Sequence, residues 1–202
     1  MNLNELFSKH KFHPVIQLPP EYEIFDFSES YDPSRTLASE FGIGRYNEQR
    51  PTMYTTELFS QNNGERRDIH MGIDIAAPEG TPVYSFFDGK VFCVGINTAP
   101  GDYGGTLITE HELSELRIWV LHGHLSHASI KSLKPDQFFR KGELIARVGS
   151  QHENGGWNPH LHFQISLQAP SGCDLPGVVT KADLQKALEI FPDPRLILGP
   201  IY

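Results

Sequence analysis

The chain has 202 residues, of which 39% are hydrophobic and 21% are charged, and its formal net charge is −8. This length and composition fit one globular domain with a sizeable core and an appended segment. Because the charge is negative and no basic stripe is present, we expect no nucleic-acid partner held through its phosphates. No stretch approaches the roughly 18 apolar residues of a membrane span, so we expect no membrane partner, and none of these features indicates an oligomeric state.

The first twenty residues, MNLNELFSKHKFHPVIQLPP, contain neither the uninterrupted apolar segment nor the small-residue cleavage site of a signal peptide. The sequence as written therefore predicts a cytoplasmic location. Cys93 and Cys173 form no CxxC motif, which fits packing residues in a reducing compartment, and a disulfide between them is the alternative.

Residues 1–65 have an irregular pattern that is rich in proline, aromatic and acidic residues, as in HPVIQLPPEYEIFDFSES. The aromatic content is too high for a free tail, so we expect an N-terminal arm of loops packed on the domain. The arm either completes the core on the far face of the domain or lies along its functional groove and partly covers it.

Residues 66–168 contain short β-branched and aromatic stretches separated by Gly, Pro, Asn and Asp: IHMGIDIAAP, TPVYSFF, GKVFCVGI, GTLITEH, LRIWVLHGHL, ELIARVGS and HLHFQISL. Strands at this density, with no helical period between them, predict a mainly β domain. The expected architecture is an antiparallel sheet, sandwich or partial barrel.

Residues 169–202 form a C-terminal extension with one predicted helix, in TKADLQKALEIF. Thr180 and Asp183 resemble a capping box, and Leu184, Leu188 and Phe191 fall on one helical face. The proline that follows ends the helix.

Five of the ten histidines lie in or beside strand-like segments: His70, His122, His124, His160 and His162. In HLH and in HGH the two histidines are two positions apart, which places each pair on one face of its strand. Two imidazoles side by side on a sheet indicate a metal site or a proton relay.

The segment HMGID spaces His70 and Asp74 four positions apart. On a regular strand these side chains would stand roughly 13 Å apart, too far for one metal, so the chain must bend, and Gly72 is the residue that permits it. A catalytic zinc site needs three protein ligands and an open position, and one histidine of HLH would complete a His₂Asp set. The alternative is that HMGID is an ordinary loop entering a strand.

Taken together, HxxxD, the later GHLS segment and HLHF resemble the lysostaphin-type (LytM-like) zinc metalloendopeptidases, which cut peptide cross-bridges in bacterial cell walls. GIDIAAPEGTPVYSFFDGKV and FFRKGELIARVGS are also similar to that family, in its order and at its spacings. The resemblance covers about residues 66–168 and implies the family's fold, the duplicated hybrid motif.

The resemblance also implies a zinc ion bound by His70, Asp74 and His162, with His124 and His160 as catalytic histidines. No HExxH glutamate is present, so proton transfer and stabilisation of the tetrahedral oxyanion fall to those two histidines. The implied activity is that of a hydrolase, a zinc-dependent endopeptidase acting on a peptide or a peptidoglycan fragment.

Two departures from the family pattern accompany the resemblance. His122 stands where relatives commonly carry an aromatic residue such as Tyr, and WNPHLHF lacks their Ser/Thr-Gly-x lead-in, which concerns the substrate groove rather than the metal. In addition, GRYNEQRPTMYTTELF, RRDIHMGIDI and PDPRLILGP are similar to versions of this module found in large cytosolic fusions with an aminotransferase-like domain.

Two other functions are compatible with these residues. A metal-binding module that no longer cleaves peptides would act as a regulatory or partner-binding domain, but such members usually lose a ligand or a catalytic histidine, and all five positions are present here. A phosphocarrier resembling the sugar-permease carrier domain would carry its phosphoryl group on histidine and would not need Asp74.

Overall fold

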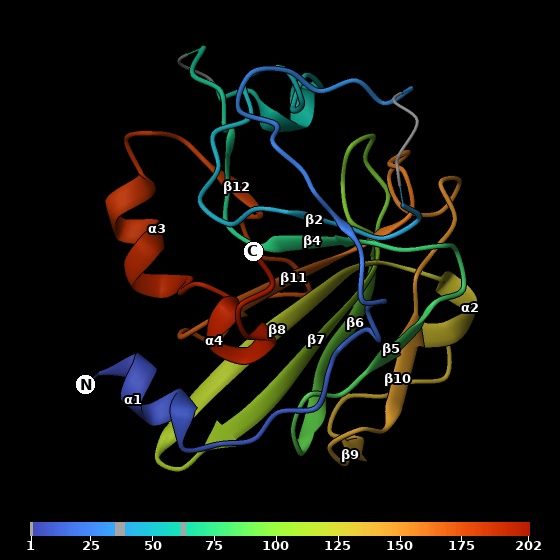
Figure 1. The fold of residues 1–202 in the computed structure, drawn as a ribbon, viewed down its shortest axis with the longest axis vertical. Coiled ribbons are helices and arrows are strands. Elements are labelled where there is room, and N and C mark those ends of the chain that lie inside the picture. Colours follow the sequence, from blue (N-terminus) through green and yellow to red (C-terminus); the bar gives the residue numbers. More distant parts are fainter. Residues whose placement is uncertain (1, 35–38, 62–63) are drawn as a thin grey trace.

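The computed structural model describes residues 2–34, 39–61 and 64–202 (Figure 1). Its helices are α1 (Leu3–Ser8), the 3₁₀ helix η1 (Glu57–Phe59), α2 (His127–Ile130), α3 (Leu184–Ile190) and α4 (Arg195–Leu198). Its strands are β1 (Glu23–Ile24), β2 (Gly42–Gly44), β3 (Ile69–His70), β4 (Ile73–Ala76), β5 (Pro82–Tyr84), β6 (Gly89–Asn97), β7 (Gly104–Leu113), β8 (Leu116–Leu125), β9 (Phe138–Phe139), β10 (Leu144–Arg147), β11 (His160–Ser166) and β12 (Val178–Val179).

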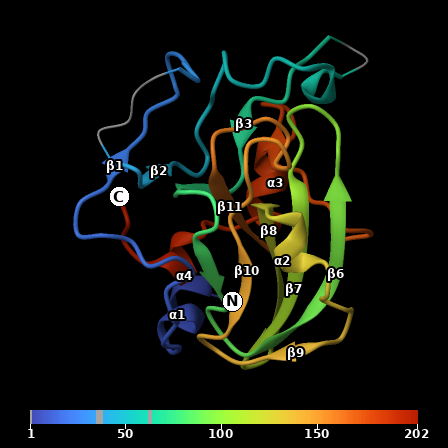
Figure 2. The ribbon, with the colours of Figure 1, turned by 90° about the vertical axis from the view of Figure 1, so that its right-hand side faces the viewer.

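Eight of these strands form one sheet in the order β1-β2-β4-β11-β8-β7-β6-β9, and the ladders β5–β10 and β3–β12 are separate. Strands β1 and β2 are parallel, whereas β4, β11, β8, β7 and β6 are antiparallel to their neighbours. Figures 1 and 2 show the long strands β6, β7 and β8 side by side, with residues 45–61 at one end of the sheet. The predicted mainly β class is confirmed, and because β1 and β9 are edges of this sheet it is open rather than a closed barrel.

The alternation of side chains along the strands divides the core between the two faces of the sheet. On one face, Leu161, Phe163 and Ile165 of β11 pack into the larger hydrophobic cluster, to which Phe7 and Ile16 of the arm also belong. Apolar residues at every second position leave the intervening residues of β11, including both histidines of HLH, on the opposite face.

The opposite face carries a second hydrophobic cluster, formed by residues of β7 and β8 together with Ala187 and Phe191. Cys93 and Cys173 pack at its edge as free thiols. The predicted C-terminal helix is confirmed as α3, and Thr180 and Asp183 exchange two hydrogen bonds just before it, of 2.9 and 3.1 Å. Helices α1, α2 and α4 are short and were not predicted.

The arm has two parts with different surroundings. Residues 2–22 complete the larger cluster, where α1 contacts α4. Residues 39–61 add β2 to the sheet beside β4 and then contact His70, whose backbone exchanges hydrogen bonds with Asn47 and Glu48. The arm therefore both completes the core and reaches the candidate site.

Candidate metal centre

His70 and Asp74 converge because the chain breaks between β3 and β4. His70 ends β3, which pairs with β12, whereas Asp74 lies in β4, between β2 and β11. A Cβ atom on Gly72 would lie 2.5 Å from Cε1 of His162. The predicted bend is present, and glycine is needed there because a second imidazole, that of His162, fills the space over its Cα.

The pairing of β11 with β4 places the third side chain of the group. His162 of β11 lies directly opposite Asp74 of β4. His70 Nε2, Asp74 Oδ1 and His162 Nδ1 are each 3.1 Å from the other two atoms, and all three residues are buried. Among the residues described, these three are the group of His, Cys, Asp and Glu side chains able to hold a metal ion.

The hydrogen bonds behind the two imidazoles fix which ring nitrogens face each other. His70 donates from Nδ1 to the carbonyl of Arg45 (2.8 Å), and His162 donates from Nε2 to Oε1 of Gln164 (2.9 Å). Carbonyl oxygens only accept, so Nε2 of His70 and Nδ1 of His162 carry lone pairs rather than protons. With Asp74 Oδ1 they place three lone pairs at hydrogen-bond distance with no proton between them, an arrangement that needs a cation. Imidazole and carboxylate donors with such outer hydrogen bonds are the donor set of a catalytic zinc site.

The charges of the centre suit the same ion. Burial opposes ionisation of Asp74, but the adjacent Arg50 guanidinium favours the carboxylate, and the pKa of Asp74 lies well below its usual value. Burial and the Arg50 charge lower the pKa of His70 to about 4. The carboxylate is therefore charged and the imidazole neutral near pH 7, as metal ligation requires.

His124 and His160 lie together beside this centre. Their ring centroids are 4.1 Å apart, and Nε2 of His160 is 3.8 Å from Oδ1 of Asp74. Each ring donates from Nδ1 to a backbone carbonyl, that of Asn154 (2.9 Å) for His124 and that of Asn158 (2.7 Å) for His160, so each Nε2 carries a lone pair. Burial lowers the pKa of both histidines and keeps them neutral.

The prediction that His122 and His124 share one face is wrong. The β7–β8 register shifts between Gly105 and Leu107, where one residue of β7 faces two of β8, and His124 adopts a left-handed φ of 61°. This bulge turns His124 toward the metal centre. His122 pairs with Phe163 and meets its ring edge-on at 5.4 Å on the core face, so it lies outside the site.

Two clefts meet at the centre, and both are lined by Met53, Asp74, Trp157 and His160. The first, of 330 Å³, also contains His70, His124 and His162. The second, of 270 Å³, is mainly apolar, and the arm supplies much of its wall through Phe25, Phe27 and Tyr31.

Sequence reasoning missed two residues that hold the ligands. Gln164 was detectable, because two positions beyond His162 it must lie on the same face of β11. Arg50, whose guanidinium contacts Asp74 at 2.7 Å, lies in the polar stretch YNEQRPTMY, where no spacing indicated a buried role.

Known proteins match part of this chain. The peptidoglycan DD-endopeptidase ShyB of Vibrio cholerae is 34% identical over 115 residues, 57% of this chain and 23% of ShyB. The uncharacterized lipoprotein YgeR of Escherichia coli is 34% identical over 98 residues, 48% of this chain and 35% of YgeR. The chain spans between 15% and 35% of the length of curated relatives that it matches.

Among solved structures, the catalytic domain of a point mutant of EnpA, a prophage-encoded M23 protein from Enterococcus faecalis, is 24% identical. It covers 71% of this chain and 93% of its own, with a TM-score of 0.47.

These relatives contradict the predicted cytoplasmic location, because YgeR is a lipoprotein and ShyB is an endopeptidase of peptidoglycan. The prediction relied on the absence of a signal-peptide pattern in the first twenty residues, and such an absence does not establish a location. Of the helices within the described residues, none is long and apolar enough to cross a membrane.

The model of peptidase family M23 matches residues 68–171, which is just over half of the chain. This segment contains the three converging side chains His70, Asp74 and His162 and both neighbouring histidines, His124 and His160. The resemblance to the lysostaphin-type enzymes is thereby confirmed, and the chain belongs to peptidase family M23.

Proposed function

We propose that this chain is a zinc-dependent metalloendopeptidase that hydrolyses peptide bonds in peptides or peptidoglycan fragments. The observation that carries the proposal is the set of three lone pairs, on His70, Asp74 and His162, that converge at 3.1 Å without a proton. Two further imidazole lone pairs lie beside them at the wall of an open cleft.

The donor set fits zinc, and His70, Asp74 and His162 would hold it. A zinc ion supplies a Lewis acid that polarises the scissile carbonyl and promotes ionisation of a water molecule. Gln164 and the Arg45 carbonyl keep the two imidazoles in the tautomers that ligation needs.

His124 and His160 carry out the proton transfers in this proposal. As the water oxygen attacks the carbonyl carbon, Nε2 of one histidine accepts the water proton. The resulting N–H hydrogen-bonds to the oxyanion or passes the proton to the departing amine nitrogen when the C–N bond breaks. Because the rings are 4.1 Å apart, repulsion between like charges favours protonation of one ring at a time.

The two clefts support an extended peptide crossing the centre, with the scissile bond beside His160. The apolar character of the second cleft, including Tyr31 and Phe27, favours an apolar group on that side of the bond. The relative ShyB, named as a peptidoglycan DD-endopeptidase, supports substrates derived from peptidoglycan. We accordingly propose that the chain acts outside the cytoplasm, which fractionation of cells expressing the native full-length protein would test.

The decisive experiment combines metal analysis with cleavage assays on peptidoglycan and a peptide panel, before and after chelation. We expect about one zinc per chain, cleavage that chelation abolishes and zinc restores, and no cleavage by the variant His162→Ala. Zinc binding without cleavage of any substrate would instead favour a non-catalytic metal-binding module. A protein that binds no zinc would refute the proposal.

Two finer predictions remain proposals. The first is the division into an arm (1–65), a peptidase domain (66–168) and an extension (169–202), which limited proteolysis would test. The second, which is an alternative to action outside the cytoplasm, is membership of the subgroup found in aminotransferase-containing fusions, supported by GRYNEQRPTMYTTELF and PDPRLILGP. An aminotransferase-like domain next to this segment in the full-length protein would support it, and export of that protein would count against it.

A further inference from the structure

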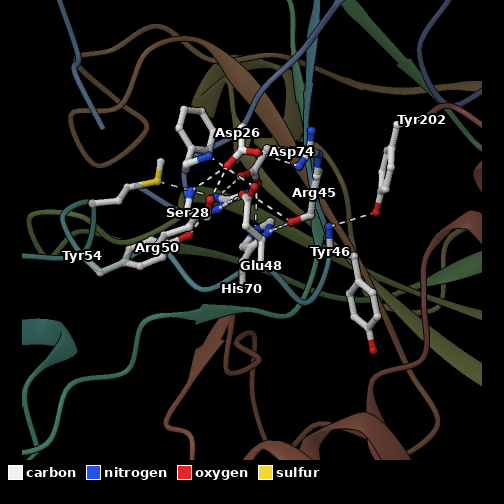
Figure 3. A network of polar contacts seen from close by, with 12 residues as sticks. Asp26, Ser28, Arg45, Tyr46, Glu48, Arg50, Tyr54, His70, Asp74 and Tyr202 are labelled. Carbon is white, nitrogen blue, oxygen red and sulfur yellow. Dashed lines mark hydrogen bonds and ion pairs between the residues drawn. The ribbon is translucent and has the colours of Figure 1, made fainter. Parts of the chain in front are cut away.

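Arg50 is an arginine of the arm that is completely buried beside the metal centre. Its exposed fraction is 0%, although arginine is among the residues least often buried without a partner. Figure 3 shows its guanidinium between Glu48, Tyr54 and Asp74. A buried cation of this kind is held by several hydrogen bonds or is strongly destabilising.

The contacts of Arg50 reach two of the three candidate ligands. One terminal nitrogen donates to Oδ2 of Asp74 at 2.7 Å, which leaves Oδ1 in the triangle of lone pairs. The other donates to the carbonyl of Arg45 at 3.2 Å. That carbonyl is the one that accepts Nδ1–H of His70, so a single guanidinium braces Asp74 directly and His70 through a shared oxygen.

The remaining contacts fix the plane of the guanidinium. Nε donates to Oε2 of Glu48 at 2.8 Å, and the nitrogen that contacts Asp74 also donates to the Tyr54 hydroxyl at 3.0 Å. The Phe27 ring lies 5.0 Å from Cζ. Lysine has no planar set of donors that could meet Glu48, Asp74 and the Arg45 carbonyl together, so the site requires arginine.

We propose that Arg50 is the positioning residue of the metal centre, which orients Asp74 and His70 for zinc. The inference rests on the proposed zinc site and extends it to the arm, a part of the chain outside the segment that the family model matches. A purely structural arginine could be held by Glu48, the Tyr54 hydroxyl and the Arg45 carbonyl without Asp74. A structural role does not explain the ion pair between Arg50 and Oδ2 of Asp74. That pair leaves Oδ1 to face His70 and His162.

The test measures zinc affinity by competition with a chelator, and the thermal midpoint of the metal-free protein, for Arg50→Met and Arg50→Lys. Arg195→Met is the matched control, because it removes another arginine–aspartate pair, with Asp193, at 2.6 Å. We expect Arg50→Met to weaken zinc binding about 10- to 100-fold, Arg50→Lys to restore part of the loss through Asp74, and Arg195→Met to keep wild-type affinity.

The outcomes separate this inference from the proposed function. If the wild-type chain binds no zinc, the proposed function fails. If wild type binds zinc and Arg50→Met binds it equally tightly, Arg50 has only a structural role and the inference fails. If Arg50→Met does not fold, the double variant Arg50→Met/Glu48→Gln is tested instead, because the neutral glutamine leaves no buried carboxylate without its cation. Zinc affinity equal to that of wild type in the double variant likewise refutes the inference. If the double variant does not fold either, Arg50→Lys decides. Zinc affinity equal to that of wild type in Arg50→Lys overturns the inference, and weaker zinc binding supports it.

Discussion

His122 offers a test of the fold that is independent of catalysis, through the variant His122→Phe. The side chain is fully buried on the core face, edge-on to Phe163. Within the described residues, neither ring nitrogen has a hydrogen-bond partner of good geometry. Burial lowers the pKa of His122 to about 4, and the nearby carbonyls of Leu107 and Val120 only partly oppose the shift.

The sign and size of the pH effect follow from linkage. The unfolded chain binds the His122 proton near pH 6.5, whereas the folded chain binds it only near pH 4. As the pH falls below 6.5, the unfolded state gains a proton that the folded state excludes, so folding stability is lost, and the loss levels off below about pH 4. Relative to pH 8, His122 therefore destabilises the fold by about 2 kcal/mol at pH 5 and by about 3 kcal/mol at the acid limit.

Urea denaturation of wild type and His122→Phe at a series of pH values from 8 to 4.5, both saturated with zinc, measures this effect. Zinc release and the titration of other histidines occur in both proteins and cancel in the difference. We expect the difference in unfolding free energy to move in favour of His122→Phe by about 2 kcal/mol between pH 8 and pH 5. Parallel curves for the two proteins would mean that His122 is hydrated or hydrogen-bonded, contrary to its place in the core.

Three further predictions concern the site. Elemental analysis should find no zinc in His162→Ala, and full zinc occupancy in that variant would refute the ligand assignment. His124→Ala should keep its zinc, but its kcat should fall by about 10²- to 10⁴-fold. Gly72→Ala places a Cβ 2.5 Å from Cε1 of His162 and should weaken zinc binding in a chelator competition, while unchanged affinity would show that His162 can shift freely. Tyr31→Ala opens the apolar cleft and should lower kcat/KM for peptides with an apolar residue beside the scissile bond more than for glycine-only peptides, and equal losses would remove that cleft from substrate binding.

The strands, and the convergence of His70 and Asp74, were predictable because both depend on local spacing, whereas the choice of His162 came from the family resemblance. Apolar residues at every second position of HLHFQIS place Phe163 in the core and His162 opposite, and the structure has them so. The break at Gly72 was predictable because four residues of straight strand cannot bring His70 to Asp74. The opposite orientations of His122 and His124 were not predictable. An extra residue in β8 reverses the alternation of side chains between the two faces of the strand, and no residue type in the sequence marks it.

Arg50 shows why the outer part of the centre escaped prediction. In sequence it is one charged residue in a polar loop, and such residues are usually solvated. Its burial depends on β2 pairing with β4, which places Gly44 opposite Asp74. A Cβ on Gly44 would lie 2.9 Å from a guanidinium nitrogen of Arg50 and 3.2 Å from Asp74, so this glycine leaves the space in which the ion pair forms. Gly44, Arg50 and Asp74 become one unit only after the arm has joined the sheet, and spacing along the chain carries no signal of that pairing.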